Sequence, residues 1–324
     1  MSEVITIWLA EREADLTTNT LRRYREAVEN HILPGVGNLR VREATVPALD
    51  RFIKAKAKTA PATARQCASV LSGVMGLAVR HGAARTNPMR DVAAVTVTVK
   101  EPRALNMDEV RSIRTAVRRW QQGLPITETD GPPKRKRGRP PTQDLLDVVD
   151  LFLATGVRIG ELLALRWADV DLDAGSVTIS GTIIMSDAKP SRPVRQPFPK
   201  GKRGRTLLLP KFAVDTLLRR RVNMPAENVH DAVFPSTNGT WRDPGNLRKQ
   251  LDRILGQIGL DWVTPHSFRK TVATVIEHDA DIRQAADQLG NGVDVTERHY
   301  VPPKTTGPDA RDTLQRLAPD SSNE

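Results

Sequence analysis

Residues 154–167 read ATGVRIGELLALRW, and this stretch predicts a helix end, a turn and a new helix in the second half of the chain. Gly156 makes a turn after an apolar helical run, and a new apolar helix begins just after Arg158. The guanidinium of Arg158 is therefore expected beside a helix start and not on a solvated face. Arginine stays charged and makes bidentate hydrogen bonds to phosphate oxygens. Arg158 is thus a candidate for binding a phosphate group.

Residues 264–274, TPHSFRKTVAT, form a second segment of this kind. Thr264 is a good N-cap and Pro265 a good first helical residue, so His266 and Arg269 lie three residues apart on one face of the first turn. The N-terminus of a helix attracts anions, and its dipole favours the neutral form of an imidazole. We therefore expect His266 to accept protons and Arg269 to bind an anion.

The chain contains only two tyrosines, Tyr24 and Tyr300. Leu21, Tyr24 and Val28 follow the spacing of one buried helix face, which predicts that Tyr24 belongs to a hydrophobic core. Tyr300 ends the short helical stretch VTERHY, and the following VPPK contains two prolines that stop the helix. If a tyrosine carries out chemistry in this protein, the sequence indicates Tyr300.

The composition favours a protein that binds nucleic acid. The net charge of +11 and the pI of about 10.1 predict attraction to a polyanion. No apolar run reaches the roughly 18 residues of a membrane span, and the N-terminus lacks the regions of a signal peptide, so we expect a cytoplasmic protein that does not bind membranes. The single cysteine, Cys67, excludes an internal disulfide and a cysteine-rich zinc cluster. The sequence suggests no metal and no cofactor.

The length of 324 residues suits two domains, and the predicted fold is mainly α with a small antiparallel β-sheet (α+β). We expect a helical domain over 1–95, a linker over 96–105, a second domain over 106–318 and a flexible tail over 319–324. The predicted helices of the first domain span 4–13, 19–33, 46–57 and 62–82. In the second domain, residues 176–180, 181–185 and 205–210 are expected to form the sheet, and 122–142 a basic insertion.

Together with QLGNGVDVTERHYV (288–301), the two segments quoted above resemble the conserved boxes of the tyrosine recombinases, in particular integrases of actinobacterial phages and integrative elements. The resemblance spans essentially the whole chain. It implies that residues 1–95 form a core-binding (SAM-like) DNA-binding domain, and that the chain from about residue 104 forms a catalytic domain. The implied activity is site-specific recombination through a 3′-phosphotyrosyl intermediate and a Holliday junction, without metal or ATP.

The resemblance also implies roles for individual residues. Arg158 and Arg269 would hold the scissile phosphate, Tyr300 would be the nucleophile, and His266 would assist proton transfer at the tyrosine. Glu161 matches an acidic position that supports the site, although a carboxylate in the first turn of a helix has an equally good structural explanation.

The lysine of the family lies in a β-hairpin, for which this chain offers QPFPKGKRGRTLLLP (196–210). Lys200 is our choice for the general acid that protonates the leaving 5′-hydroxyl, with Lys202 as the alternative. Lys202, Arg203 and Arg205 are otherwise expected to be charges that face DNA.

Asn291 departs from the family pattern, because histidine or tryptophan usually occupies this position, nine residues before Tyr300. An asparagine can donate a hydrogen bond to a phosphate oxygen but cannot transfer a proton. We expect Asn291 to belong to the site and to give weaker transition-state stabilisation without loss of activity. His299, next to the nucleophile, is expected to point elsewhere.

The resemblance also implies the partners. These are double-stranded DNA with inverted-repeat core sites, and further copies of the chain in a homo-tetramer that exchanges its C-terminal helix (307–317). Accessory factors that control direction or bend DNA are a further possibility. Arg137 and Arg139 lie in a stretch similar to an AT-hook, although a solvated basic loop that contacts phosphates without sequence preference is the favoured interpretation.

Two alternative functions and one question of domain architecture remain open from the sequence. A catalytically degenerate relative would bind DNA without cutting it, and a type IB topoisomerase would share the chemistry without needing paired sites. The first predicted helix begins close to Met1, so the chain is either a two-domain recombinase or a truncated form of a longer integrase with an arm-binding domain.

Overall fold

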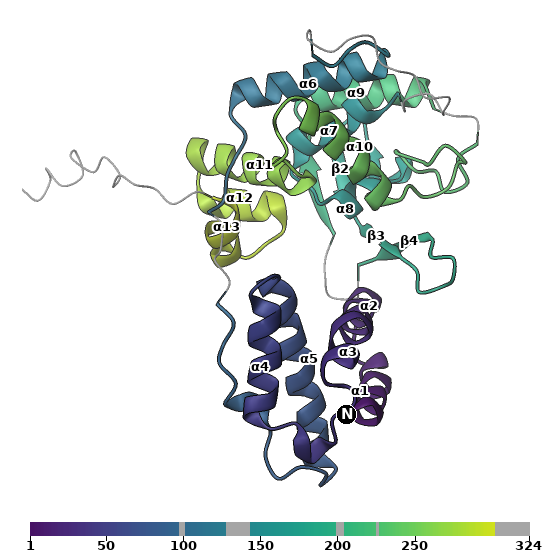
Figure 1. The fold of residues 1–324 in the computed structure, drawn as a ribbon. Helices are drawn as coiled ribbons and strands as arrows, with labels where there is room; N and C mark the ends of the chain where they lie inside the picture. The colour runs from purple at the N-terminus through teal and green to yellow at the C-terminus, as the bar shows by residue number, and fades with distance from the viewer. Residues whose placement is uncertain (97–100, 128–142, 199–203, 225–226, 302–324) are drawn as a thin grey trace, which may run out of the picture. The chain divides into compact units, whose positions relative to one another are not determined.

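The computed structural model describes residues 1–96, 101–127, 143–198, 204–224 and 227–301. The chain divides into two compact units. Figure 1 shows their helices and strands, with a colour that follows the residue number. The first comprises Met1–Lys100 and Ile184–Arg195, and the second Glu101–Ile183 and Gln196–Glu324. The division after residue 100 falls within the predicted linker, whereas the sequence had suggested that residues 184–195 belong to the second domain.

The first unit is a helical module built around one long central helix, α5. Its helices are α1 (Ser2–Glu13), α2 (Thr18–Ala27), α3 (Leu33–Val36), α4 (Val46–Ala57) and α5 (Pro61–Arg80). Helices α1, α2 and α4 pack against α5, whose buried face includes Cys67. Tyr24 stacks on Trp8 with ring centroids 5.5 Å apart, and it is partly buried against the hydrophobic core, on the side of the helix that the sequence predicted.

One helix of the first unit runs further than expected. The sequence predicted an end at Pro34, but a π-helical turn, Val28–Ile32, leads directly into α3, and Pro34 lies in the first turn of that helix. The π-helical turn lies just before Pro34, where a proline without a backbone N–H could not continue the regular α-helical hydrogen bonding.

The second unit contains the helices that carry the predicted site. These are α6 (Met107–Gln121), α7 (Leu145–Thr155), α8 (Ile159–Leu163), α9 (Lys211–Val222), α10 (Pro244–Gln257), α11 (Pro265–Asp279), α12 (Ile282–Leu289) and α13 (Val293–Tyr300). Helix α7 is the apolar centre and contacts α6, α9 and α11. Phe152 of α7 and Phe268 of α11 are fully buried and stack with centroids 5.6 Å apart. This contact fixes the start of α11 beside the end of α7.

The strands of the second half of the chain form two small sheets. Strands β1 (Val170–Asp171), β2 (Ser176–Ile179) and β5 (Arg205–Leu208) form an antiparallel sheet in the order β1-β2-β5. Strands β3 (Gly181–Met185) and β4 (Pro193–Pro197) pair separately. The prediction that β3 shares a sheet with β2 and β5 was wrong, because β1 and β5 occupy both edges of β2.

The last three described helices of the second unit lie together. Helix α11 contacts α12 and α13 as well as α7, and Figure 1 shows the three yellow-green helices as one cluster. No helix in the described part of the chain is long and apolar enough to cross a bilayer.

Candidate active site

A tight turn after α7 brings Arg158 to the start of α8. Gly156 caps α7 in the left-handed conformation, with φ at 65°. A Cβ on this glycine would lie 2.8 Å from Leu289 and 3.0 Å from Val272, so close packing as well as the backbone angle requires glycine. Arg158 then occupies the N-cap of α8 in extended conformation, as the sequence predicted.

Glu161 fixes the orientation of Arg158. Its carboxylate accepts from Nη1 of Arg158 at 2.8 Å and from the backbone N–H of Arg158 at 3.1 Å. Glu161 is only 4% exposed, and burial raises its pKa, but the charges and hydrogen bonds of Arg205 and Arg158 outweigh burial and lower the pKa below its usual value. Glu161 is therefore anionic at neutral pH, and the structure supports both its structural role and its role beside the site.

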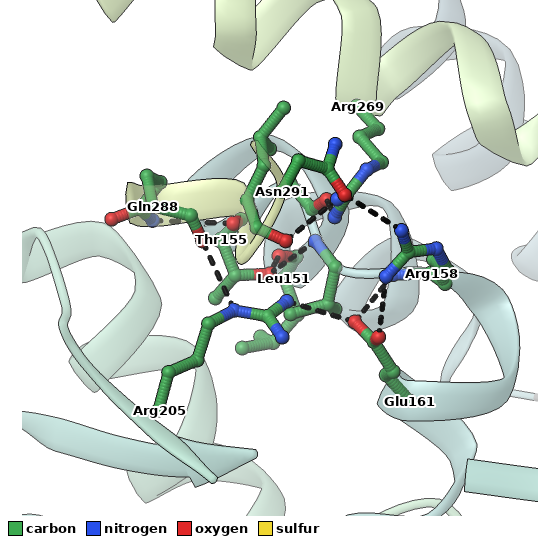
Figure 2. Close-up of polar contacts among 11 residues, drawn as sticks. Leu151, Thr155, Arg158, Glu161, Arg205, Arg269, Gln288 and Asn291 are labelled. Atoms are coloured by element: carbon green, nitrogen blue, oxygen red, sulfur yellow. Dashed lines mark hydrogen bonds and ion pairs between the residues drawn. The ribbon is translucent and has the colours of Figure 1, made fainter. Parts of the chain in front are cut away.

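Arg158 also reaches Asn291, which is 133 residues further along the chain. Nη2 of Arg158 donates to Oδ1 of Asn291 at 2.8 Å, as the dashed lines in Figure 2 show. The asparagine that replaces the usual histidine or tryptophan thus lies beside the first arginine.

Arg269 is the largest fully buried side chain of the described residues, with an exposed fraction of 0%. Nη1 donates to the carbonyl of Gly156 at 2.7 Å, and Nη2 donates to the carbonyl of Leu289 at 2.6 Å. Burial and then the charge of Arg158 lower its pKa to about 10, so it stays protonated at neutral pH. Both carbonyls are uncharged, and Arg269 also interacts with the side chain of Tyr300, so among the described residues no paired carboxylate neutralises its positive charge.

Two buried donors at this place have no hydrogen-bond partner among the described residues: Nε of Arg269 and Nδ2 of Asn291. Leaving a buried donor unpaired costs about 1–3 kcal/mol, and such cost is tolerated where a ligand supplies the partner. A phosphate offers several acceptor oxygens at once. We name Arg158, Arg269 and Asn291 the anion clamp.

Tyr300 lies against the anion clamp in the same chain. Its side chain is 6% exposed and packs on Ala273 and Leu289. Cζ of Arg269 lies 5.2 Å from the centroid of the Tyr300 ring, and the ring of His266 lies 4.9 Å from it at an angle of 55°. The structure thus gathers the predicted nucleophile, the predicted proton acceptor and both predicted arginines.

His266 is neutral at physiological pH, as its place at a helix start suggested. Burial by its neighbours, followed by the positive charges of Arg269, Lys270 and Arg158, lowers its pKa to about 4. The residue nevertheless remains exposed to solvent. The surrounding cations are a cause that the sequence pattern did not reveal.

The low pKa of His266 predicts an effect on stability. The unfolded chain takes up a proton on this side chain near pH 6.5, whereas the folded protein does so only near pH 4, so stability falls as the pH drops through this window. In His266→Gln we expect a smaller fall of Tm between pH 7 and pH 5 than in the wild type, measured by thermal denaturation. Burial raises the pKa of Asp147 to about 6, so this group makes stability rise as the pH drops. Its contribution is the same in the wild type and in the variant. An equal fall of Tm in both would contradict the assignment.

Arg205 is placed differently from the DNA-facing charge that the sequence suggested. Its side chain is 16% exposed, and Nη2 donates to Oε2 of Glu161 at 2.8 Å. Nε donates to the carbonyl of Gln288 at 3.1 Å. Gln288 in turn donates through Nε2 to the carbonyl of Thr155 at 3.2 Å, a link that sequence reasoning missed.

Five predicted site residues lie outside the described residues. They are Lys200, Lys202 and Arg203 in the segment 199–203, and Arg137 and Arg139 in the segment 128–142. The described residues contain no group of three or more histidine, cysteine, aspartate or glutamate side chains placed to hold a metal ion.

Comparison with family models assigns the class of protein. Residues 139–305 match the model of the phage integrase family, and residues 1–95 match that of the phage integrase central domain. The chain therefore belongs to the phage integrase family, the tyrosine recombinases that the three sequence segments resemble.

Curated tyrosine recombinases are similar to this chain in sequence. Tyrosine recombinase XerC of Corynebacterium efficiens is 31% identical over 158 residues, which is 48% of this chain and 44% of the relative. Tyrosine recombinase XerC of Xanthomonas campestris pv. campestris is 25% identical over 296 residues, covering 89% of this chain and 80% of the relative.

Solved structures share the fold. The Tn1549 transposon integrase in complex with transposon right end DNA has a TM-score of 0.75 at 16% identity, covering 98% of this chain and 100% of that chain. The lambda integrase tetramer bound to a Holliday junction has a TM-score of 0.64 at 18% identity, covering 90% of this chain and 76% of that chain.

Proposed function

We propose that this protein is a site-specific DNA recombinase that cleaves and rejoins DNA through a covalent bond between Tyr300 and a 3′-phosphate. One observation carries the proposal. The buried ring of Tyr300 lies 5.2 Å from Cζ of Arg269, and Arg269 and Asn291 each keep one unpartnered buried donor, as expected for a site that binds a phosphodiester.

The anion clamp acts on the transition state. As the tyrosine oxygen attacks, negative charge builds on the non-bridging oxygens of the phosphate. Nε of Arg269, Nδ2 of Asn291 and the guanidinium of Arg158 donate to these oxygens. Arg269 is held by the carbonyls of Gly156 and Leu289, Arg158 by Glu161, and Asn291 by Arg158, so the three groups need little reorganisation during the reaction.

His266 removes the proton of Tyr300 during attack. In the free protein its low pKa makes it a weak base, because cations surround it. A bound phosphodiester adds negative charge beside these cations, which raises the pKa of His266 towards the range of an effective base. The bond between Oη of Tyr300 and phosphorus forms while the bond between phosphorus and the 5′-oxygen breaks.

The departing 5′-oxygen needs a proton, which we assign to Lys200, with Lys202 as the alternative. The reverse reaction with the 5′-hydroxyl of another strand rejoins the DNA and releases Tyr300. The phosphotyrosine keeps the energy of the broken bond, so the cycle needs no ATP.

The partners follow from the chemistry of strand exchange. We propose that two protomers bind inverted repeats of a core site and that two such pairs form a homo-tetramer on a Holliday junction in the cytoplasm. The net charge of +11 supports binding to DNA, and the fold is shared with a lambda integrase tetramer on such a junction. Exchange of the segment 307–317 between protomers and the use of accessory factors belong to the same proposal.

The experiment traps the covalent intermediate on DNA of many sequences at once. The full chain is incubated with a pool of nicked duplexes that carry randomised sequence beside the nick, so that the short cleaved fragment diffuses away and religation stops. Complexes that survive denaturant are isolated, and their DNA is sequenced. We expect enrichment of an inverted repeat. Binding without any stable adduct would instead favour the catalytically degenerate alternative.

The role of Asn291 gives a separate prediction. Asn291→Asp keeps the acceptor for Arg158 but replaces the Nδ2 donor by a negative charge beside the phosphate, so we expect adduct formation about 10–100 times slower. Asn291→His restores a proton donor and should accelerate cleavage. Single-turnover rates on the trapped site measure both, and an unchanged rate in Asn291→His would argue against a place for Asn291 in the site.

A further inference from the structure

Three arginines converge on the turn that joins α12 to α13. Arg205 donates to the carbonyl of Gln288, Arg269 to that of Leu289, and Arg158 to the side chain of Asn291. Figure 2 shows Arg205 and Arg158 approaching the turn from two separate elements. Helix α13 follows this turn, begins at Val293 and ends at Tyr300. The position of the turn therefore determines the position of the helix that carries the nucleophile.

Arg205 closes a ring of hydrogen bonds around the site. From Arg205 the ring runs through Nη2 to Glu161, from Glu161 to Arg158, from Arg158 to Asn291, and along the turn to Gln288, whose carbonyl accepts from Nε of Arg205. The aliphatic stem of Arg205 also lies on Gly290, where an added Cβ would meet Cδ of Arg205 at 3.0 Å. Arg205 thus joins the sheet, α8 and the turn before the nucleophile.

The charges within the ring do not cancel. Glu161 is buried with one negative charge and contacts two arginines, Arg158 and Arg205. With Arg205 present, the three groups carry one net positive charge, and Arg158, whose side chain is 41% exposed against 16% for Arg205, is the arginine that a phosphate reaches more easily. Without Arg205, Arg158 would be the only arginine of the ring paired with Glu161, and the carboxylate would neutralise its positive charge. The attraction of Arg158 for a phosphate would then weaken, because a buried carboxylate close to a cation offsets its field strongly.

We propose that Arg205 is a positioning residue of the cleavage reaction: it engages Glu161 so that Arg158 keeps its charge for the scissile phosphate, and it fixes the turn that places Asn291. This inference rests on the proposed function. It assigns Arg205 to the phosphate side of the reaction, although Arg205 follows in sequence directly after the segment with Lys200 and Lys202.

The test compares Arg205→Met with the wild type on three versions of the trapped core site. The first carries an ordinary phosphate at the cleavage position. The second carries a methylphosphonate, which lacks one negative charge and so needs less cationic stabilisation. The third carries a bridging 5′-sulfur, whose thiolate leaves without a general acid. Methionine keeps most of the stem that packs on Gly290 but removes the charge and both donors.

We expect Arg205→Met to form the adduct about 10–100 times more slowly on the phosphate and on the 5′-sulfur substrate. On the methylphosphonate the deficit should shrink to less than about threefold, because the lost positive charge matters less there. Arg205→Lys, which keeps the charge but reaches only one of the two acceptors, should fall between the two proteins.

Arg166→Met is the matched control. Arg166 pairs with Asp169 through Nε at 3.2 Å, and this carboxylate is 7% exposed, but neither residue belongs to the ring. Its loss should change stability without changing the relative rates on the three substrates. This separates a general effect of breaking an arginine–carboxylate pair from an effect on the phosphate.

Three outcomes would overturn the inference: an unchanged rate in Arg205→Met, an equal deficit on all three substrates, or rescue by the 5′-sulfur. The last would assign Arg205 to the leaving-group side. A wild-type protein that forms no adduct on any duplex would instead contradict the proposed function, so the two failures are distinguishable.

Discussion

We expect Tyr300→Phe to form no denaturant-stable adduct with DNA and still to bind the same duplexes. The substitution removes one oxygen from a side chain that is 6% exposed and leaves the ring in its contacts with Ala273 and Leu289. The fold should therefore survive, with a stability change of at most about 1 kcal/mol. The chemistry cannot survive, because phenylalanine has no oxygen to bond to phosphorus.

Tyr24→Phe is the control, because Tyr24 is the other tyrosine of the chain and packs against the core of the first unit. This variant should form the adduct at the wild-type rate. Gel separation after denaturation with labelled DNA measures both variants, and mass spectrometry of the digested adduct identifies the modified residue. An adduct that persists in Tyr300→Phe would refute the assignment of the nucleophile.

The sequence predicted those parts of the site that depend on local rules. The N-cap and proline of 264–274 fix where α11 begins, and the three-residue spacing then brings His266 and Arg269 to its first turn. Gly156 marks the end of α7 for an equally local reason, its left-handed backbone. Such signals need only neighbouring residues.

The parts that were missed depend on distant residues. Arg205 is 44 residues from Glu161, and at the start of a strand its charge looks the same whether it faces DNA or a buried carboxylate. The separate pairing of β3 likewise depends on which strands already occupy the edges of β2. A local pattern holds no information on these choices, since tertiary packing decides them.

The second large effect is expected for Arg269→Lys, although charge is conserved. The two carbonyls of Gly156 and Leu289 accept from the two terminal nitrogens of one planar guanidinium, while Nε stays free for the phosphate. A lysine has a single nitrogen, so it satisfies at most part of this set. We expect adduct formation to fall on the order of 10³-fold, because a transition-state donor is lost and the turn that leads to Asn291 loosens.

The same substitution also destabilises the protein, since a buried carbonyl left without its donor costs about 1–3 kcal/mol. Arg220→Lys separates this effect from catalysis. Arg220 is 8% exposed, donates to the carbonyl of Val233 and pairs with Asp144 at 3.1 Å, with no contact to the anion clamp. It should lose stability in the same range and keep its single-turnover rate when assayed well below Tm. If both variants lost activity equally, Arg269 would be only a structural residue, because its buried position and not its free Nε would then account for the defect.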